Sequence, residues 1–245
     1  LAISAVMMAA SYAYQRFAQK PMKPGDRNLE ASVSDARQYV KTIYGYHKVP
    51  LDIIFHDVDP DNSQIWWVVG VIGHGEIESI DTMSFDDRRV IDWENNSGYL
   101  SPFTGLINTQ RYYGTENQTA NATLVSKFPD QWNSSCTGNG IAYIVLSINL
   151  DKDAFPNGLP NVMSVKVKGK KVKDIRDVSW PNCSATYSNN PINCILDYHV
   201  GGRDANNIIR YGVGARTSQI RVSKWITEAN YCDDLVDVPV NSPPA

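Results

Sequence analysis

The amino-acid sequence predicts a β-rich α+β fold, with two helices near the C-terminus and one apolar helix at the N-terminus. Between residues 40 and 170, apolar residues alternate with polar ones or form short continuous runs, as in strands with one or both faces buried. After residue 189, two segments instead carry apolar residues at helical spacing. Three parts are therefore expected: an apolar helix and linker (1–24), a β-rich domain (25–160) and an α+β domain (161–245).

The composition argues against several classes of protein. A hydrophobic content of 42% and a charged content of 20% are ordinary for a soluble globular protein. The net charge of −3 gives no global reason to expect binding to nucleic acid or to an anionic membrane. The four histidines are scattered, and the four cysteines show no Cys-x-x-Cys spacing. Because catalytic and nucleotide-binding motifs are also missing from the sequence, we expect no enzyme, no metal site and no cofactor.

The first segment, Leu1–Gln19, could have three roles. A signal-peptide remnant is disfavoured, since no basic region precedes the segment and no clear cleavage site follows it. A membrane span is possible by length, but four polar or charged residues weaken that interpretation. Burial in an oligomer is favoured, because Ala5, Ala9 and Ala13 form a small-residue stripe that permits close approach of another helix.

Three aspartates in the next part have the spacing of a calcium loop. Asp57, Asp59 and Asp61 match the start of such a loop. Asn62, however, stands where the loop requires glycine, and Val68 stands where it requires an acid. The sequence therefore predicts a solvated turn that binds no calcium.

Two segments have strong strand patterns. Residues 65–72 form a continuous apolar run, which predicts a strand covered on both faces. Glu76 and Glu78, which follow, flank Ile77 in alternation, as is typical of a half-buried strand rather than of paired catalytic acids. A second strand begins near Gly140 and is expected to bury one row of side chains: Ile144, Leu146, Ile148 and Leu150.

Residues 163–173 are predicted to form a hairpin. The first strand alternates apolar residues with serine and lysine, Gly169 and Lys170 supply the turn, and Lys171–Lys173 begins the return strand. Its lysines are expected to form a charged solvent face, with phosphate binding as the less favoured alternative: Lys166, Lys168, Lys170, Lys171 and Lys173.

The first C-terminal helix is expected over residues 191–200. Asn190 is its candidate N-cap, Pro191 stands at the first helical position, and Gly201 with Gly202 ends it. Four apolar residues are predicted to share its buried face: Ile192, Ile195, Leu196 and Val200.

The second C-terminal helix is expected from Ser218, a candidate cap, to Cys232. Five residues are predicted to line its apolar face: Val222, Trp225, Ile226, Ala229 and Cys232. Cys194 and Cys232 are therefore expected to be reduced, buried core residues. A bridge between Cys183 and Cys194 is the less favoured alternative.

Several motifs resemble those of the tail tip attachment, or baseplate hub, proteins of long-tailed bacteriophages such as lambda. The "VKGxxVxD" pattern of residues 167–174 precedes "YSNNPxxCxxDY" at 187–198 in the order and separation typical of that family. Further similarities lie in "GEIExI" at 75–80, "GTxxQ" at 114–118 and "YCD" at 231–233. The resemblance assigns structural roles to twelve residues: Gly75, Glu76, Ile77, Gly169, Asp174, Tyr187, Asn190, Pro191, Cys194, Asp197, Trp225 and Cys232.

The resemblance extends over roughly residues 35–235 and implies a tail-tube-like hub β domain. It implies a structural protein of the virion tail tip, assembled in the bacterial cytoplasm as a homotrimeric ring. The expected partners are the tail tube, distal tail proteins and the tape measure protein, and DNA would pass through the ring without specific binding. Residues 1–19 would then lie near the symmetry axis, with transient membrane contact possible. The chain would be the N-terminal part of a longer protein that serves host attachment and genome ejection.

Two alternatives come from the residues themselves. The high tyrosine and tryptophan content also suits a receptor- or carbohydrate-binding module. The apolar first segment also suits a membrane-active component of DNA injection.

Overall fold

The computed structural model describes residues 40–156, 158–203 and 207–234. The expected N-terminal helix and linker, with Ala5, Ala9 and Ala13, lie outside the described residues. Among the residues that the structure does describe, no helix is long and apolar enough to cross a membrane.

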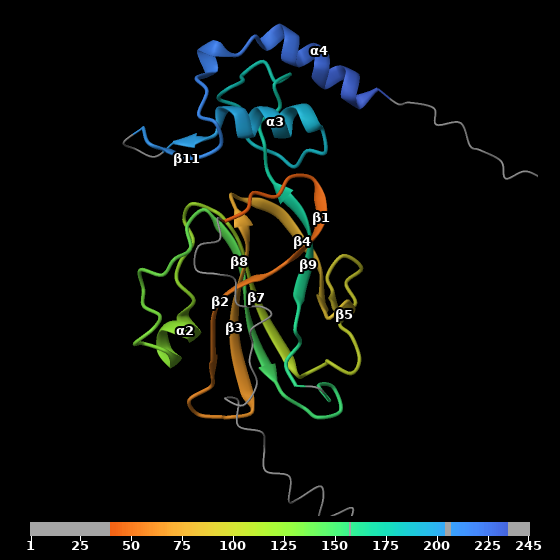
Figure 1. The fold of residues 1–245 in the computed structure, drawn as a ribbon, viewed down its shortest axis with the longest axis vertical. Coiled ribbons are helices and arrows are strands. Elements are labelled where there is room, and N and C mark those ends of the chain that lie inside the picture. Colours follow the sequence, from red (N-terminus) through yellow and green to blue (C-terminus); the bar gives the residue numbers. More distant parts are fainter. Residues whose placement is uncertain (1–39, 157, 204–206, 235–245) are drawn as a thin grey trace, which may run out of the picture.

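Two antiparallel sheets pack face to face and form a sandwich (Figure 1). One has five strands in the order β1 (Tyr46–Pro50), β9 (Met163–Lys170), β4 (Ile77–Phe85), β5 (Arg88–Asp92) and β6 (Gly98–Tyr99). The other has four strands in the order β2 (Asp52–Val58), β3 (Ile65–His74), β8 (Ile141–Asn149) and β7 (Ile107–Tyr113). The predicted β-rich α+β class is confirmed for the described residues.

The main core lies between the two sheets. The strand predicted at 65–72 is confirmed as β3, in which every residue but the first and last is buried. The row predicted for β8 is also confirmed, since Ile144, Leu146 and Ile148 are completely buried and Leu150 packs beside them. Because side chains alternate along a strand, β3 contributes Val68 and Ile72 to this core, and Trp67, Val69 and Val71 to the opposite face.

The opposite face of the four-stranded sheet is covered by the short helix α2 (Ala122–Lys127), which lies beside β2 and β3 in Figure 1. Leu124 and Phe128 pack there against Trp67, Val69 and other buried residues. Asn121 caps the helix by accepting a hydrogen bond of 2.9 Å from the Leu124 amide. A second layer over this face explains why β3 is apolar on both sides.

The turn between β2 and β3 differs from the solvated turn that was predicted. Asp61 is exposed, but Asp59 is buried, with 5% of its surface exposed. Its carboxylate accepts a 2.8 Å hydrogen bond from the Trp67 indole and forms a 2.8 Å ion pair with Lys127 of α2. Burial alone would raise the pKa of Asp59, but Lys127 and the Trp67 N–H lower it below its usual value. Asp59 therefore anchors α2 to the sheet.

The prediction of a hairpin at 163–173 was wrong. β9 continues straight through Gly169 to Lys170, and Val172 makes only an isolated bridge with Thr186. Gly169 is required for close approach rather than for a turn, since a Cβ atom there would lie 2.3 Å from the Ile43 carbonyl oxygen. β9 pairs with both β1 and β4, so the sandwich takes strands from both sides of the boundary expected at 160/161.

The residues after β9 form a helical segment, which we define as residues 171–203 and 207–234. It contains α3 (Pro191–Val200), a short ribbon of β10 (Gly202–Arg203) and β11 (Ile209–Tyr211), a 3₁₀ turn (Thr217–Gln219) and α4 (Val222–Asp233). Figure 1 shows this segment at one end of the sandwich. Its small core consists of Ile175, Leu196 and Ala229, with partly buried Trp225 and Ile226 beside them.

The predicted ends of α3 are confirmed, but two features of its buried face are not. Asn190 caps the helix, Pro191 is its first residue and Gly201 follows it. Ile195, expected on the buried face, is 54% exposed, whereas the polar Asn193 is completely buried. The side of α3 that faces the core carries Ile192, Leu196 and Val200, and Ile195 lies off this line. Asn193 is buried because its side-chain oxygen accepts a hydrogen bond from the Ile175 amide.

The second helix is shorter than predicted. α4 begins after Arg221, which makes no side-chain cap bond, and Ser218 belongs to the separate 3₁₀ turn. Ala229 is buried as expected, but Val222 is exposed and so is Cys232. The prediction that Cys232 is a core residue was therefore wrong, because α4 contacts its neighbours along a narrower face than its sequence suggests.

Candidate functional site

The helical segment meets the sandwich at five side chains, which we name the junction cluster: Tyr44, His74, Lys170, Asp197 and Tyr211. Tyr44 precedes β1, while His74 and Lys170 end β3 and β9. Asp197 belongs to α3 and Tyr211 ends β11. Elements far apart in the sequence thus place one cation, one anion and three aromatic side chains together.

The centre of the junction cluster is an ion pair between Lys170 and Asp197. The lysine Nζ lies 2.6 Å from both carboxylate oxygens and 2.8 Å from the Tyr211 hydroxyl. The two charged side chains are only 11% and 15% exposed. Burying either charged group alone would be costly, so each one needs the other at close range.

Two tyrosines complete the surroundings of Asp197. The Tyr44 hydroxyl donates a hydrogen bond of 2.5 Å to one carboxylate oxygen, and the Tyr211 hydroxyl lies 3.2 Å from the same atom. Burial, together with the neighbouring Asp197 carboxylate, raises the pKa of both tyrosine hydroxyls above their usual value. Both tyrosines therefore remain neutral donors.

His74 and Cys194 lie beside the ion pair. The His74 ring packs against Tyr211, with ring centroids 4.8 Å apart. Burial and the Lys170 charge lower the pKa of His74, although Asp197 opposes this effect. Burial also raises the pKa of the Cys194 thiol, and the Asp197 carboxylate adds to that effect. The histidine is thus held neutral and the thiol protonated, so neither adds a charge beside the ion pair.

A glycine makes room for the lysine. Gly75 has a φ of +91°, and a Cβ atom there would lie 2.7 Å from the Lys170 side chain. Any other residue would therefore be strained and would also push the lysine away from Asp197.

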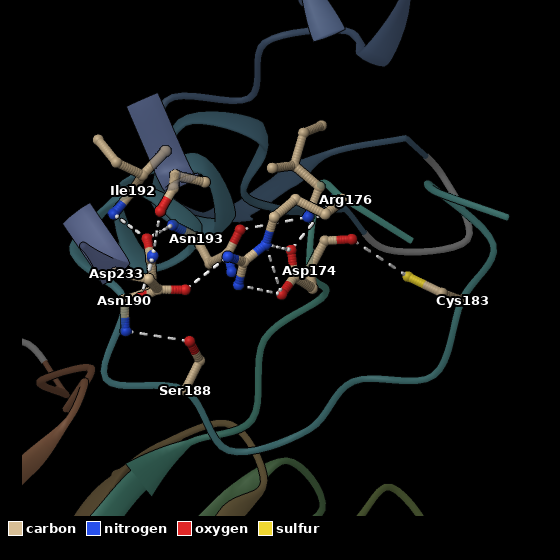
Figure 2. Close-up of polar contacts among 10 residues, drawn as sticks. Asp174, Arg176, Cys183, Ser188, Asn190, Ile192, Asn193 and Asp233 are labelled. Atoms are coloured by element: carbon tan, nitrogen blue, oxygen red, sulfur yellow. Dashed lines mark hydrogen bonds and ion pairs between the residues drawn. The ribbon is translucent and has the colours of Figure 1, made fainter. Parts of the chain in front are cut away.

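A second polar cluster fixes α4 to α3, and we name it the anchoring network (Figure 2): Asp174, Arg176, Asn190 and Asp233. The Arg176 guanidinium donates hydrogen bonds to Asp174, from Nε to Oδ1 at 2.9 Å and from Nη2 to Oδ2 at 2.7 Å. It also donates to Asp233. The guanidinium holds the pKa of Asp174 below its usual range, and Arg176 with Asn190 does the same for Asp233.

Asn190 connects this network to the helix backbones. Its side-chain oxygen accepts from the amides of Ile192 and Asn193, while its nitrogen donates to the Ala229 carbonyl at 2.8 Å and to Asp233 at 2.7 Å. One asparagine therefore caps α3 and at the same time binds the last turns of α4. Figure 2 shows Asn190 between Ser188, Asp233 and the first turn of the helix.

The twelve residues singled out by their motifs fall into several places. Gly75 and Asp197 meet at the junction cluster, with Cys194 one helical turn away, and Asp174 and Asn190 belong to the anchoring network. Pro191 begins α3, Ile77 lies in the sandwich core, and Trp225 packs in the helical core.

The remaining motif residues lie at the surface or near it. Glu76 forms an exposed ion pair with Lys171, and Cys232 is exposed. Tyr187 donates a hydrogen bond to Asn189, next to the cap of α3. All four cysteines are free, and Cys194 is buried as predicted.

The lysines of β9 are not the uniform solvent face that was predicted. Lys170 is buried in the junction cluster, and the Lys166 ammonium lies 4.4 Å from the centre of the Tyr46 ring. The outward row of β9 is therefore covered at one end by the helical segment. Alternation along the strand could not reveal this, because the covering residues come from α3 and β11.

No pattern in the sequence predicted that Tyr44, His74, Tyr211 and Arg176 contribute to these clusters. One signal did exist: Asn193 and Asp197 are four residues apart in α3, so both polar side chains interrupt one face of the helix. In the described part of the chain, no three histidine, cysteine, aspartate or glutamate side chains are placed to hold a metal ion. The junction cluster can hold the sandwich and the helical segment together through an ion pair and hydrogen bonds.

No protein-family model and no curated protein sequence matches this chain. Among solved structures, the chain is similar to a protein in the virion of a native gene transfer agent particle, with 18% sequence identity and a TM-score of 0.39. The similarity covers 77% of this chain and 45% of that protein, so this chain spans less than half of the protein it resembles.

Proposed function

We propose that the chain is a structural subunit of a phage-like tail, located in the hub at the distal end of the tail tube. The observation that carries this proposal is the position of the residues that resemble the tail tip family. Gly75 and Asp197 belong to the contact that holds the helical segment on the sandwich. Asp174 and Asn190 belong to the network that fixes α4 to α3 within that segment. Motif residues whose contacts fix the architecture in this way suit a structural subunit of an assembly.

In the proposed role, three copies form a ring around the tube axis. The sandwich would continue the tube, and the partners would be tube, distal tail and tape measure proteins. DNA would pass through the ring on ejection without specific contacts. Residues 1–19 would lie toward the axis in the assembled ring, where Ala5, Ala9 and Ala13 could approach neighbouring helices.

Gold-conjugated antibody against the chain tests this proposal on tailed particles from the organism that encodes it. Electron micrographs are expected to show gold at the distal end of the tail. Gold on the capsid or along the tail shaft, or absence of the chain from purified particles, would contradict the proposal. As a control for access, the labelling is repeated on particles whose tail ends have been opened with mild detergent.

A further inference from the structure

The helical segment carries exposed apolar residues on the side away from its core. We define the apolar face as Ile195 and Tyr198 of α3, Ile209 of β11 and Val213. These side chains are 54%, 51%, 44% and 58% exposed, respectively. The small core of the segment lies on the other side of α3, around the completely buried Leu196.

The four residues lie on adjacent parts of the helical segment. Ile195 and Tyr198 are three residues apart on α3 and so lie on the same side of the helix. Val213 is tied to Tyr198 by a hydrogen bond of 2.9 Å from its amide to the Tyr198 carbonyl. The Ile209 side chain lies over Gly214, since a Cβ atom on that glycine would be 2.3 Å from Ile209 Cδ1. Exposed apolar side chains gathered on one part of a protein mark a candidate binding surface for another segment or protein.

The chain enters the described structure next to α3, the helix that carries Ile195 and Tyr198. The Tyr44 hydroxyl is hydrogen bonded to Asp197, the residue just before Tyr198. Val40 lies four residues earlier, so it is within about 15 Å of Tyr44 even in a fully extended chain. Residues 20–39 can span up to about 70 Å, whereas α3 is only about 15 Å long. Residues 1–19 can therefore reach every part of the apolar face.

The composition of the first segment suits such a surface. Residues 1–19 are rich in alanine, methionine and other apolar residues and contain one charged residue, Arg16. Left in water, both the segment and the apolar face would favour aggregation. Covering one with the other removes apolar surface of both from water.

We propose that residues 1–19 cover the apolar face of the same chain before it assembles with other subunits. The segment of the same chain is favoured over a second copy because a short tether gives it a local concentration in the millimolar range. A separate copy at micromolar concentration would compete poorly for the face. The proposal does not depend on the tail assignment.

Photo-crosslinking within the full chain tests the proposal. Tyr198 is replaced by the photoreactive p-benzoylphenylalanine, and unlabelled chains are mixed with an equal amount of ¹⁵N-labelled chains before illumination. Mass spectrometry is expected to find peptides of residues 1–19 joined to the probe peptide, with both peptides carrying the same isotope. Mixed-isotope pairs would show that a neighbouring copy supplies the cover and would overturn the proposal. Crosslinks only to other residues, or none, would overturn it as well.

Two further variants separate docking from chance proximity. A probe at Ile54, which is 60% exposed on β2 and outside the apolar face, is expected to capture no peptide of residues 1–19. Val213→Asp, combined with the probe at position 198, is expected to lower the crosslink yield at least about fivefold, because a charge opposes apolar contact. An unchanged yield would contradict the proposal. If the probe at 198 disturbs folding, the half-exposed Ile195 offers a second probe position with the same expected results.

Discussion

Lys170 is the residue on which the contact between the sandwich and the helical segment most depends. Its side chain is 11% exposed, and its ammonium group contacts the Asp197 carboxylate and the Tyr211 hydroxyl. Such a pair adds little over well-packed apolar residues, but removing one partner leaves a buried charge without compensation. The ion pair therefore specifies how the helical segment sits on the sandwich more than it adds stability.

Asp197→Asn is expected to lower the free energy of unfolding by about 2–4 kcal/mol, because it leaves the Lys170 ammonium unpaired. Urea denaturation measures the effect. The double variant Lys170→Met/Asp197→Leu is expected to recover most of the loss, since neither charge is then buried. Asp87→Asn is the matched control: it breaks the exposed Lys48–Asp87 pair and should change stability very little. If Asp197→Asn costs no more than this control, the role assigned to the ion pair is wrong.

Cys194→Ser is expected to destabilise the protein by about 1–3 kcal/mol, because burying a hydroxyl costs more than burying a thiol. The Ser188 carbonyl, which accepts from the thiol at 3.7 Å, offsets only part of that cost. Cys232→Ser, on the exposed side of α4, provides the comparison and should leave the unfolding curve unchanged. Mass spectrometry without reductant is expected to find both thiols free. A Cys194–Cys232 or Cys183–Cys194 bridge would refute the prediction that these are free thiols.

At the scale of single residues, the sequence predicted the side chains whose function is local. Asn190 and Pro191 could be assigned because a helix N-terminus has its own residue preferences. The burial of Lys170 and Asp59 could not be predicted, since each depends on a partner far away in the sequence, Asp197 in one case and Lys127 in the other. Pairings between distant elements leave no periodic signal along the chain.

At the scale of elements, the sequence predicted the positions of the strands better than the connections between them. β3 and β8 matched their apolar patterns, because burial of both faces or of one face fixes the residue types at successive positions. The glycine of β9 was misinterpreted as a turn. Glycine serves close backbone approach as well as turns, and only the position of Ile43 distinguishes the two uses here.

Asn190 contributes to the contact between α3 and α4 both as the cap of α3 and through its bonds to α4. Asn190→Ala is expected to lower stability by about 1–3 kcal/mol, because it removes the cap of α3 together with the bond to the Ala229 carbonyl. Arg221→Ala alters the same position before α4, where no side-chain cap bond exists, and is expected to have little effect. Thermal unfolding of the two variants gives the comparison. Equal shifts in melting temperature would show that the cap of α3 has no special role.

The turn between β2 and β3 is expected to bind no calcium. Asp59 is already engaged by Lys127 and by the Trp67 indole, so its carboxylate is not available to a cation without breaking those bonds. Isothermal titration calorimetry is expected to give no heat of binding up to about 1 mM calcium, the affinity of the weakest known modules. Tighter binding that Asp59→Asn abolishes would contradict this assignment.

As a whole, the described molecule is a sandwich with a small helical segment fixed to one end by the junction cluster (Figure 1). The segment has a small core of its own, so its position depends on polar contacts rather than on a large shared apolar surface. These polar contacts can keep the helical segment in one orientation on the sandwich when the protein is part of an assembly. The exposed apolar face lies on this helical segment.

The assembled tail end provides the most direct test of the proposed function. Cryo-electron microscopy of tailed particles from the encoding organism is expected to show three copies of the sandwich in a ring at the distal end of the tube. In that ring, the segment of residues 1–19 is expected nearer to the axis than the sandwich. Ala9→Leu should disturb the approach of these segments while leaving the sandwich folded. A map in which the distal ring is built by another protein, with this chain elsewhere in the particle or missing from it, would contradict the account.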